Sequence, residues 1–295
     1  MDPSVEHVVP DADLVRSLLA AQHPDLAELP LVEMQPGWDN SLWRLGDDLL
    51  VRLPRRALAA PLTAHEQRWL PELAPLLPLP IPVPVRVGAP TFGFPWPWSV
   101  VPWLEGSPGD RAAITQPDES AARLGGFLRA LHRPAPAGAP HNPYRSIPLA
   151  ERAAGFDGFV SRMEDGVDVA GARRVWEQSL AAKPWPGPPL WLHADLHPAN
   201  TLFADGLLAA VLDFGDLCAG DPATDLAAAW LLLPASAQPV FLAAYGGVDD
   251  DTRRRSLGWA VLFALMLVSI GTDGRPTYGT AGRAALERVL ASGQD

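Results

Sequence analysis

Hydrophobic and polar positions follow different periods in the first third of the chain and in the rest. Apolar positions at helical spacing predict a helix over residues 11–23, with Asp11 or Asp13 as its N-cap. Short apolar runs then predict strands over residues 31–36 and 41–53, and a Gly-Asp-Asp turn inside the second run makes it a hairpin. The chain is therefore expected to begin with one helix and a few antiparallel strands.

A second helix and a proline-rich segment follow this hairpin. The sequence predicts a helix over residues 63–77, in which Thr63 is the N-cap and Glu66 completes a capping box. From residue 78 to 108 prolines recur too often for a helix. Short apolar pieces in this segment, such as 98–101, favour edge strands and fixed connections.

Helical periodicity dominates the remainder of the chain. An amphipathic helix is predicted over residues 119–132, and further helical patterns occupy 149–163 and 170–182. From residue 222 onward the pattern is nearly all helical. Strands thus cluster before helices, which indicates an α+β fold in two lobes.

The change of pattern places a lobe boundary near residue 103. We expect a small β-rich N-terminal lobe over residues 1–103 and a hinge at about residues 99–104. A larger, mainly helical C-terminal lobe is expected over residues 104–295. The length of 295 residues is sufficient for two lobes that each bury a core.

Composition and charge narrow the class of protein. Hydrophobic residues make up 48% of the chain and charged residues 19%, which is typical of a globular protein. The formal net charge of −11 argues against binding to nucleic acid and favours the attraction of cationic small molecules. Cys218 is the only cysteine, so we expect no internal disulfide and no thiolate metal site.

The sequence pattern does not predict export or membrane insertion. Residues 1–22 carry several acids and no basic n-region, unlike a signal peptide. The longest apolar run, Trp259 to Ile270, is too short to span a bilayer and is predicted to be a core helix. We therefore expect a cytoplasmic protein without membrane contacts.

Two short motifs carry the chemistry. The run HADLHPAN at residues 193–200 fits the H-x-D-x-x-x-x-N pattern of a kinase catalytic loop, and DFG follows at residues 213–215. Phosphoryl transfer needs a carboxylate near the acceptor hydroxyl and hard oxygen ligands that hold Mg²⁺ against nucleotide phosphates. Asp195 would supply the carboxylate, and Asn200 and Asp213 would supply the oxygen ligands.

These motifs, together with strands that precede helices, resemble the aminoglycoside phosphotransferase family. That family is a branch of the protein-kinase-like fold that also includes macrolide and choline kinases. The resemblance runs from about residue 30 to 290 and is most specific at residues 192–200, at 221–227 and at Leu131-His132. It implies a bilobal protein-kinase-like fold, with an N-terminal nucleotide-binding lobe and a C-terminal lobe that carries the catalytic loop and the substrate site.

The resemblance also implies roles for single residues. Asp195 would be the catalytic base or orienter of the acceptor hydroxyl, and Asn200 and Asp213 would ligate Mg²⁺. His193 would brace the catalytic loop. Asp225 would bond the backbone of that loop, and His197 would support it as well.

Two features of the predicted phosphate site depart from the family pattern. Arg52 stands where the family has a lysine, and Glu66 is its natural partner because an ion pair would orient the guanidinium. The phosphate loop around Gly37 has that one glycine instead of a glycine-rich run. Backbone amides near Gly37 and the side chains of Asn40 and Ser41 are predicted to reach phosphate oxygens.

Further contacts are predicted at the hinge and near the metal motif. The Val101 carbonyl and the Trp103 amide are expected to read the edge of the nucleotide base, since Pro102 cannot donate a hydrogen bond. Asp216 faces either solvent or a cationic substrate. Asp221 is either the N-cap of a helix or a substrate contact.

Together these features predict a Mg²⁺-dependent kinase that moves the γ-phosphoryl group of ATP or GTP onto a hydroxyl of an aminoglycoside-type antibiotic. A macrolide or a small amino alcohol stays open as the acceptor, because net charge does not separate these compounds. A catalytically silent nucleotide-binding or ligand-binding protein with a kinase fold also stays open, since the usual lysine is missing. The intact set of Asp195, Asn200 and Asp213 argues against that alternative.

Overall fold

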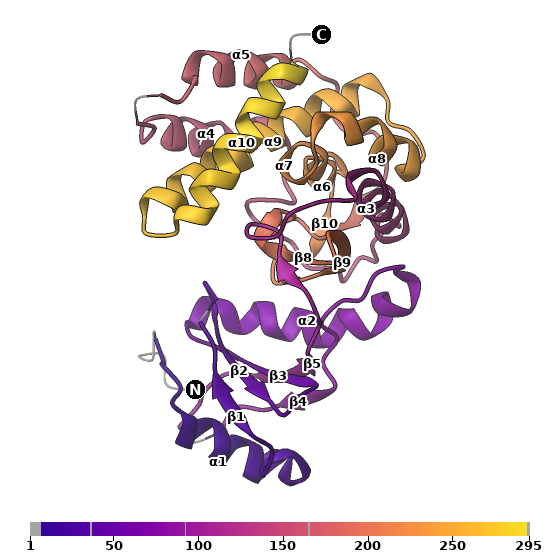
Figure 1. Cartoon of the computed structure of the whole chain (residues 1–295). Helices are drawn as coiled ribbons and strands as arrows, with labels where there is room; N and C mark the ends of the chain where they lie inside the picture. Colours follow the sequence, from indigo (N-terminus) through magenta and orange to yellow (C-terminus); the bar gives the residue numbers. More distant parts are fainter. Residues whose placement is uncertain (1–6, 36, 92, 165, 294–295) are drawn as a thin grey trace. The chain divides into compact units, whose positions relative to one another are not determined.

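The computed structural model describes residues 7–35, 37–91, 93–164 and 166–293. The chain forms two compact units, each described by itself below. Unit 1 comprises residues 1–76, 80–104 and 213–215, and unit 2 comprises residues 77–79, 105–212 and 216–295. Unit 1 is built on a sheet and unit 2 is mainly helical, which confirms the predicted α+β fold class (Figure 1). The division after Leu104 lies beside the boundary expected near residue 103.

Unit 1 is built on a five-stranded antiparallel sheet with the strand order β1-β2-β3-β5-β4. Its strands are β1 (Leu31–Glu33), β2 (Asn40–Leu45), β3 (Leu49–Pro54), β4 (Arg86–Gly88) and β5 (Trp98–Pro102). A tight turn joins β2 to β3, and Gly46 adopts a left-handed φ of 58° in it, so the predicted hairpin is confirmed.

Strand alternation gives this sheet an apolar face and a charged face. Val51 and Leu53 of β3 lie on the apolar face and belong to one buried cluster with residues of helix α1 (Ala12–Gln22). Arg52 stands between them in sequence, so its side chain lies on the opposite face. Helix α2 (Ala60–Leu73) covers that second face (Figure 1).

Of the helices α1 and α2 in unit 1, the first begins where the sequence predicts and the second does not. Helix α1 begins as predicted, and the Asp11 side chain accepts a hydrogen bond from the Leu14 backbone N–H at 2.8 Å. Helix α2 begins earlier than predicted, because Pro61 has a fixed φ that suits the first helical turn. Thr63 therefore lies inside the helix, where its hydroxyl donates to the Ala59 carbonyl, and the predicted capping box is wrong.

Unit 2 packs helices around two small sheets. Its helices are α3 (Pro117–Leu131), α4 (Ala153–Val160), α5 (Val169–Leu180), α6 (Ala223–Leu226), α7 (Ala228–Leu232), α8 (Gln238–Tyr245), α9 (Asp250–Thr272) and α10 (Pro276–Ser292). Its strands are β6 (Ser107–Pro108), β7 (Leu190–Leu192), β8 (Thr201–Ala204), β9 (Leu207–Val211) and β10 (Cys218–Gly220). Strand β7 pairs with β10, and β8 pairs with both β6 and β9. The predicted catalytic loop therefore runs from the end of β7 to the start of β8.

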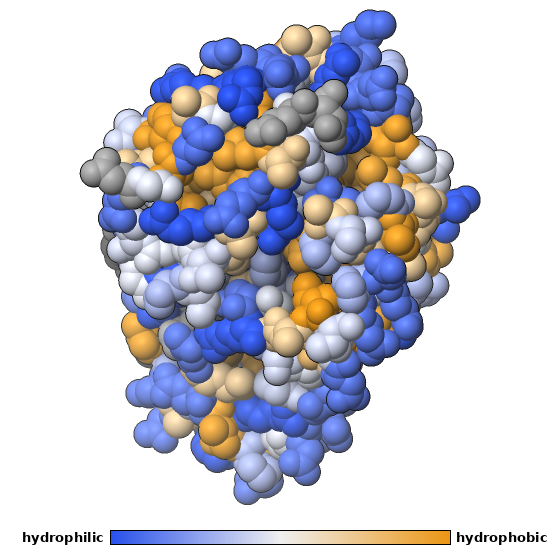
Figure 2. Space-filling view, turned by 45° about the horizontal axis from the view of Figure 1, so that its top comes forward, coloured by the Kyte–Doolittle hydropathy of each residue, from blue (hydrophilic) through white to orange (hydrophobic). Residues whose placement is uncertain are grey.

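Helix α9 is the core helix of unit 2. The Asp249 side chain caps it by accepting a hydrogen bond from the Thr252 backbone N–H at 2.7 Å. The apolar run predicted over residues 259–270 is part of this longer helix. By length and composition alone the whole helix could cross a membrane. However, 78% of its most apolar window is buried inside the protein, which confirms the predicted core helix. On the face shown in Figure 2, hydrophilic residues surround the apolar areas.

Candidate active site

The catalytic loop in unit 2 contains a strained residue beside Asp195. Ala194 has a φ of 68°, in the left-handed region that costs a non-glycine residue about 1–2 kcal/mol. Its backbone N–H donates to Oδ1 of Asp225 at 2.7 Å, and the His193 N–H donates to Oδ2 of Asp225 at 2.7 Å. Asp225 is buried in α6 and holds the loop in this conformation, so its predicted bonds to the loop backbone are confirmed.

Asp225 is in turn held by the buried side chain of His132, which is itself bonded to Tyr245. Nε2 of His132 lies 3.2 Å from Oδ2 of Asp225, and Nδ1 of His132 lies 2.9 Å from the Tyr245 hydroxyl. Burial, with the nearby carboxylates of Asp225 and Asp221, raises the pKa of Tyr245, so its hydroxyl stays protonated. His132 thus connects α3 and α8 to the catalytic loop through Asp225.

His193 supports the loop from within the core. Its side chain is fully buried, with Nε2 2.8 Å from the Leu212 carbonyl, and its Nδ1 accepts a hydrogen bond from the Asp195 N–H at 3.2 Å. Because Nδ1 accepts, the ring proton is on Nε2 and is donated to Leu212. The predicted role of His193 as a brace of the catalytic loop is confirmed, since both ring nitrogens are used to position the loop.

Asp195 presents its carboxylate among three neighbouring side chains. Nδ2 of Asn200 donates to its Oδ2 at 3.0 Å and to its backbone carbonyl at 2.9 Å. Nε2 of His197 lies 3.4 Å from Oδ2, and a terminal nitrogen of Arg145 lies 3.6 Å from Oδ1. Burial alone would raise the pKa of Asp195, but His197 and Arg145 outweigh burial and hold that pKa well below its usual range. Asp195 is therefore an anionic carboxylate with a defined orientation.

Arg145 is a residue of this cluster that no sequence motif contains. It lies in the loop between α3 and α4 and is buried, with its Nε donating to the Ala194 carbonyl at 3.0 Å. Arginine is common on surfaces, and a single arginine outside a motif carries no sequence signal for such a contact.

The two carboxylates predicted near the acceptor already have partners within unit 2. Asp216 accepts a hydrogen bond from Nδ2 of Asn142 at 2.6 Å. Asp221 accepts from Nε of Arg255 at 2.6 Å and from the Ala223 N–H at 3.0 Å. The N-cap residue of α6 is Pro222, one position after the predicted one, and the Asp221 side chain bonds the first N–H of this helix from just before the cap. A contact of either carboxylate with substrate stays a prediction.

In unit 1, Arg52 and Glu66 form a buried ion pair. A terminal nitrogen of Arg52 lies 3.0 Å from Oε1 of Glu66, and the two side chains are 10% and 5% exposed. The same Glu66 oxygen accepts from the Phe214 N–H at 3.2 Å, and the other terminal nitrogen of Arg52 is 3.9 Å from Oδ1 of Asp213. Burial alone would lower the pKa of Arg52, but the carboxylates of Glu66 and Asp213 raise it, so its charge persists. The predicted pair exists, and it also orients the Asp213 segment.

The predicted phosphate loop is a tight turn that its own backbone closes. The Gly37 N–H donates to the Asn40 carbonyl at 2.9 Å, and the Arg55 N–H donates to the Asp39 carbonyl at 2.8 Å. The side chain of Arg56 pairs with that of Asp39. The Gly37 amide is therefore used inside the turn, and a contact of the neighbouring backbone amides with phosphate stays a prediction. Pro36 lies outside the described residues.

Asn40 and Ser41 lie on opposite faces of the sheet, because side chains alternate along β2. Ser41 pairs in register with Leu53 and is buried on the apolar face. Asn40 is two residues from Leu42, the register partner of Arg52, so it shares the charged face with Arg52. The predicted phosphate contact of Ser41 is wrong for this reason, while that of Asn40 stays a prediction.

The end of β5 corrects the predicted base contacts. The Trp103 N–H donates to the Asp48 carbonyl at 2.7 Å, so this amide is not available to a base. The Val100 carbonyl accepts a hydrogen bond on the β4 side, and strand alternation therefore turns the polar groups of Val101 toward β3. The carbonyl that points away from β3 at this end of the strand is that of Pro102.

The donor set predicted for Mg²⁺ has suitable chemistry. No group of three or more His, Cys, Asp or Glu side chains forms a metal cluster within the described ranges. Mg²⁺ does not need such a cluster, because it keeps several waters and binds one or two carboxylates together with substrate phosphates. The amide nitrogen of Asn200 is used by Asp195, which leaves its amide oxygen as a ligand, and the Asp213 side chain is 54% exposed.

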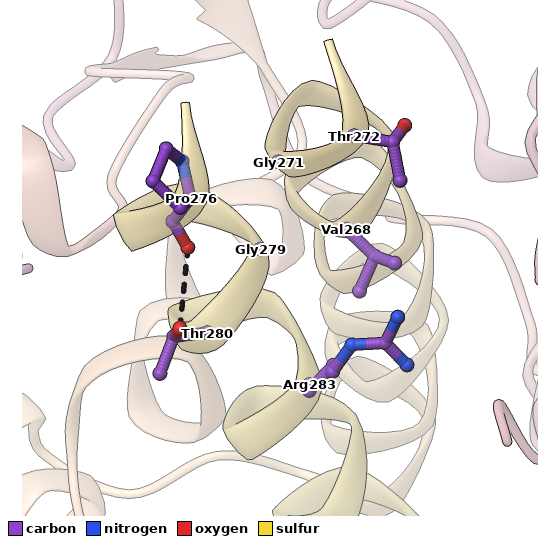
Figure 3. A pocket seen from close by; sticks show the side chains of 7 residues that line it. All are labelled: Val268, Gly271, Thr272, Pro276, Gly279, Thr280 and Arg283. Carbon is purple, nitrogen blue, oxygen red and sulfur yellow. Dashed lines mark hydrogen bonds between the residues drawn. The ribbon is translucent and has the colours of Figure 1, made fainter. Parts of the chain in front are cut away.

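A pocket of about 200 Å³ lies between α9 and α10 in unit 2 (Figure 3). Its lining residues are Val268, Gly271, Thr272, Pro276, Gly279, Thr280 and Arg283. The two glycines allow the helices to cross closely, since a Cβ on Gly271 would lie 2.3 Å from Cα of Gly279. None of these lining residues carries a carboxylate, so the pocket offers no acidic group to a polycation.

Comparison with known proteins identifies the family. A model described as "Phosphotransferase enzyme family" matches residues 31–259, which is more than half of the chain. The chain belongs to the phosphotransferase enzyme family. Both the catalytic loop and the Asp213 segment lie inside the matched residues. No curated protein sequence matches the chain.

Solved structures of similar fold include aminoglycoside and macrolide phosphotransferases. The GDP complex of wild-type aminoglycoside 2'-phosphotransferase-IIIa has a TM-score of 0.70 and 20% identity, over 96% of this chain and 99% of that chain. The apoenzyme of macrolide 2'-phosphotransferase MphH from Brachybacterium faecium has a TM-score of 0.61 and 25% identity, over 94% and 97%. The streptomycin–ATP–APH(2")-IIa complex has a TM-score of 0.60 and 17% identity, over 92% and 95%. The phosphotransferase fold therefore extends over nearly the whole chain.

Family membership confirms the prediction of a phosphotransferase with a kinase-like fold. The sequence match supports phosphoryl transfer as the reaction class, and the residues described above are the groups of this chain that are suited to it.

Proposed function

We propose that this phosphotransferase is a Mg²⁺-dependent small-molecule kinase that transfers the γ-phosphoryl group of a nucleoside triphosphate to a hydroxyl of an aminoglycoside-type antibiotic. The observation that carries the proposal is the Asp195 carboxylate, which is anionic, oriented by Asn200 and followed in sequence by the Asp213 segment. An anionic, oriented carboxylate is the group that phosphoryl transfer to a hydroxyl requires.

In the proposed reaction Asp195 accepts a hydrogen bond from the acceptor hydroxyl and directs its oxygen toward the γ-phosphorus. A bond forms between that oxygen and phosphorus, the bond from phosphorus to the β–γ bridging oxygen breaks, and the nucleoside diphosphate leaves. The hydroxyl proton passes to Asp195. Because its low pKa makes Asp195 a weak base, we expect it to orient the hydroxyl first and to take the proton late.

The residues of unit 1 would bind the nucleotide. Arg52 keeps its charge and has its guanidinium oriented by Glu66, so it can neutralise phosphate oxygens. Asn200 and Asp213 would hold Mg²⁺, which when bound neutralises charge on the phosphates and orients them. The nucleotide assignment is supported by similar structures that contain GDP or ATP. The Pro102 carbonyl replaces Val101 and Trp103 as the proposed contact of the base edge.

A macrolide is the second candidate acceptor, and two observations favour it. The carboxylates of Asp216 and Asp221, which would bind a polycation, are held by Asn142 and Arg255. In addition, the macrolide phosphotransferase MphH is 25% identical over 94% of this chain. Aminoglycosides and macrolides should therefore be tested side by side.

The proposed function can be tested with a coupled assay for nucleoside diphosphate release, with Mg·ATP and Mg·GTP, against aminoglycosides, macrolides and amino alcohols. Acceptor-dependent turnover, with the mass of one added phosphate on the acceptor, would support the proposal and identify the acceptor class. Nucleotide binding without turnover for any acceptor would instead favour a silent binding protein that has kept the fold.

A further inference from the structure

In unit 2 the Arg145 side chain contacts both the Ala194 carbonyl and the Asp195 carboxylate. Its Nε donates to the Ala194 carbonyl at 3.0 Å, and a terminal nitrogen lies 3.6 Å from Oδ1 of Asp195. The N–H of Ala194 is held on its other side by Asp225. Both backbone polar groups of the strained residue that precedes Asp195 are therefore fixed by buried side chains.

The guanidinium of Arg145 is itself fixed by packing against helix α9. It lies over the Phe263 ring, 4.5 Å from the ring centroid, and a terminal nitrogen lies 3.6 Å from Sδ of Met266. The Arg145 side chain is 10% exposed, so little water screens its charge. The charge that faces Asp195 is therefore held in one place.

The turn that carries Arg145 is anchored to the residue after the metal motif. The backbone N–H groups of Arg145 and Ser146 donate to the Asn142 carbonyl at 3.3 and 2.9 Å. The Asn142 side chain accepts from the Tyr144 N–H at 2.8 Å and donates to Oδ1 of Asp216 at 2.6 Å. Hydrogen bonds thus link Asp216 through Asn142 to the backbone of Arg145, which anchors the residue that carries the guanidinium.

We propose that Arg145 is a positioning residue for phosphoryl transfer, an inference that rests on the function proposed above. Arg145 places its positive charge 3.6 Å from Oδ1 of Asp195 and fixes the peptide before it, while Asn200 and His197 contact Oδ2. The carboxylate then meets the acceptor hydroxyl in one orientation. Since a misplacement of about 1 Å costs about 10²-fold in rate, loss of Arg145 should lower kcat and leave nucleotide binding nearly unchanged.

The first test compares variants of Arg145 with a matched control. Arg145→Gln should lower kcat by about 10²-fold, with the KM for nucleotide changed by less than about twofold. Arg145→Lys keeps a charge and should recover part of kcat. Arg173→Gln removes an exposed arginine of α5 that pairs with Asp157, and should match the wild type.

Chemical rescue separates positioning from a merely structural role. Methylguanidinium added to the Arg145→Ala variant should raise kcat several-fold, whereas methylammonium at equal ionic strength should not. Full activity in Arg145→Gln would overturn the proposal. A loss of kcat that follows the loss of folded protein and is not rescued would also overturn it.

A second test does not depend on turnover. The variants Arg145→Gln and Asp195→Asn, alone and combined, are unfolded in urea to measure the coupling between the two residues. Their effects should be non-additive by about threefold or more in the unfolding equilibrium constant, and additive effects would overturn the proposed contact. Clear coupling in a protein that turns over no acceptor would support the contact and overturn the proposed function.

Discussion

The residues around Asp195 and those around Arg52 are held in different ways. In unit 2 the backbone of the catalytic loop is fixed by buried side chains from distant parts of the chain, chiefly those of Asp225 and Arg145. In unit 1 the Arg52 side chain is held through its guanidinium alone, by Glu66 at 3.0 Å and by Asp213 at 3.9 Å. A loop fixed at its backbone allows few replacements, whereas a paired cation can be arginine or lysine. We therefore expect replacements around Asp195 to be more damaging than the replacement of Arg52 by lysine.

The largest effect is expected at Asp195. The Asp195→Asn variant removes the charge that orients the acceptor hydroxyl, and kcat should fall by about 10³-fold. Nucleotide affinity should stay within about threefold of the wild type, because Asp195 is not one of the proposed nucleotide contacts. Steady-state kinetics combined with calorimetric nucleotide binding would check both parts, and unchanged kcat would remove Asp195 from the reaction.

A large loss of stability is expected at Asp225. Its two carboxylate oxygens accept from the N–H groups of His193 and Ala194, both at 2.7 Å. Asp225→Asn turns one of these acceptors into a donor that faces an N–H, and we expect a loss of about 2–4 kcal/mol in the free energy of unfolding. Urea unfolding measures this value, and a change below about 0.5 kcal/mol would show that the loop does not depend on Asp225.

A smaller effect on catalysis is expected at Arg52. Arg52→Ala removes an oriented cation and should lower kcat/KM for nucleotide by about 10²-fold, which corresponds to the loss of a charge-assisted hydrogen bond. Arg52→Lys should retain a substantial part of this value, since a single charged donor can still pair with Glu66. If Arg52→Ala bound and used nucleotide normally, Arg52 would be a structural ion pair only.

Asn40 and Ser41 are neighbours in sequence but lie on opposite faces of the unit 1 sheet, so their substitutions should affect the KM for nucleotide differently. Asn40→Ala should raise the KM for nucleotide several-fold, because Asn40 shares the face of Arg52. Ser41→Ala should change this KM by less than about twofold, because Ser41 lies on the buried apolar face. The reverse order of the two effects would contradict the assignment of faces.

The mildest test needs no substitution, because the reactivity of the Cys218 thiol reports on the opening of unit 2. Burial raises the pKa of this thiol to about 12, so almost none of it is thiolate at pH 8. We expect slow reaction with a disulfide reagent in the native protein and fast reaction in urea. Since Cys218 is the only cysteine, the rate reports on the opening of unit 2 without any substitution. Fast native labelling would show that the region around β10 opens readily.

The parts of the fold that could be predicted are those with local signals. Alternation and turn residues were sufficient for the β2–β3 hairpin, and helical spacing with an aspartate cap was sufficient for α1. The catalytic loop could be predicted because Asp195 and Asn200 are close in sequence and bond directly. These predictions required no knowledge of distant partners.

The parts that could not be predicted depend on strand parity or on distant partners. Adjacency in sequence predicts a shared role for Asn40 and Ser41, but a strand turns adjacent side chains to opposite faces. The sequence does not reveal that the Trp103 amide bonds Asp48, because this partner lies on a neighbouring segment of the sheet. Arg145 acts through a residue 49 positions away, and no local pattern reveals such a contact.

The central claim is that this chain moves a phosphoryl group onto a small-molecule hydroxyl and that Asp195 enables the transfer. The most direct test uses ATP or GTP radiolabelled at the γ-phosphorus, with the wild type and Asp195→Asn compared on the acceptor that gives turnover. We predict that label accumulates on the acceptor with the wild type and is nearly absent with the variant. Label that appears only in inorganic phosphate, or equal transfer by both proteins, would contradict the claim.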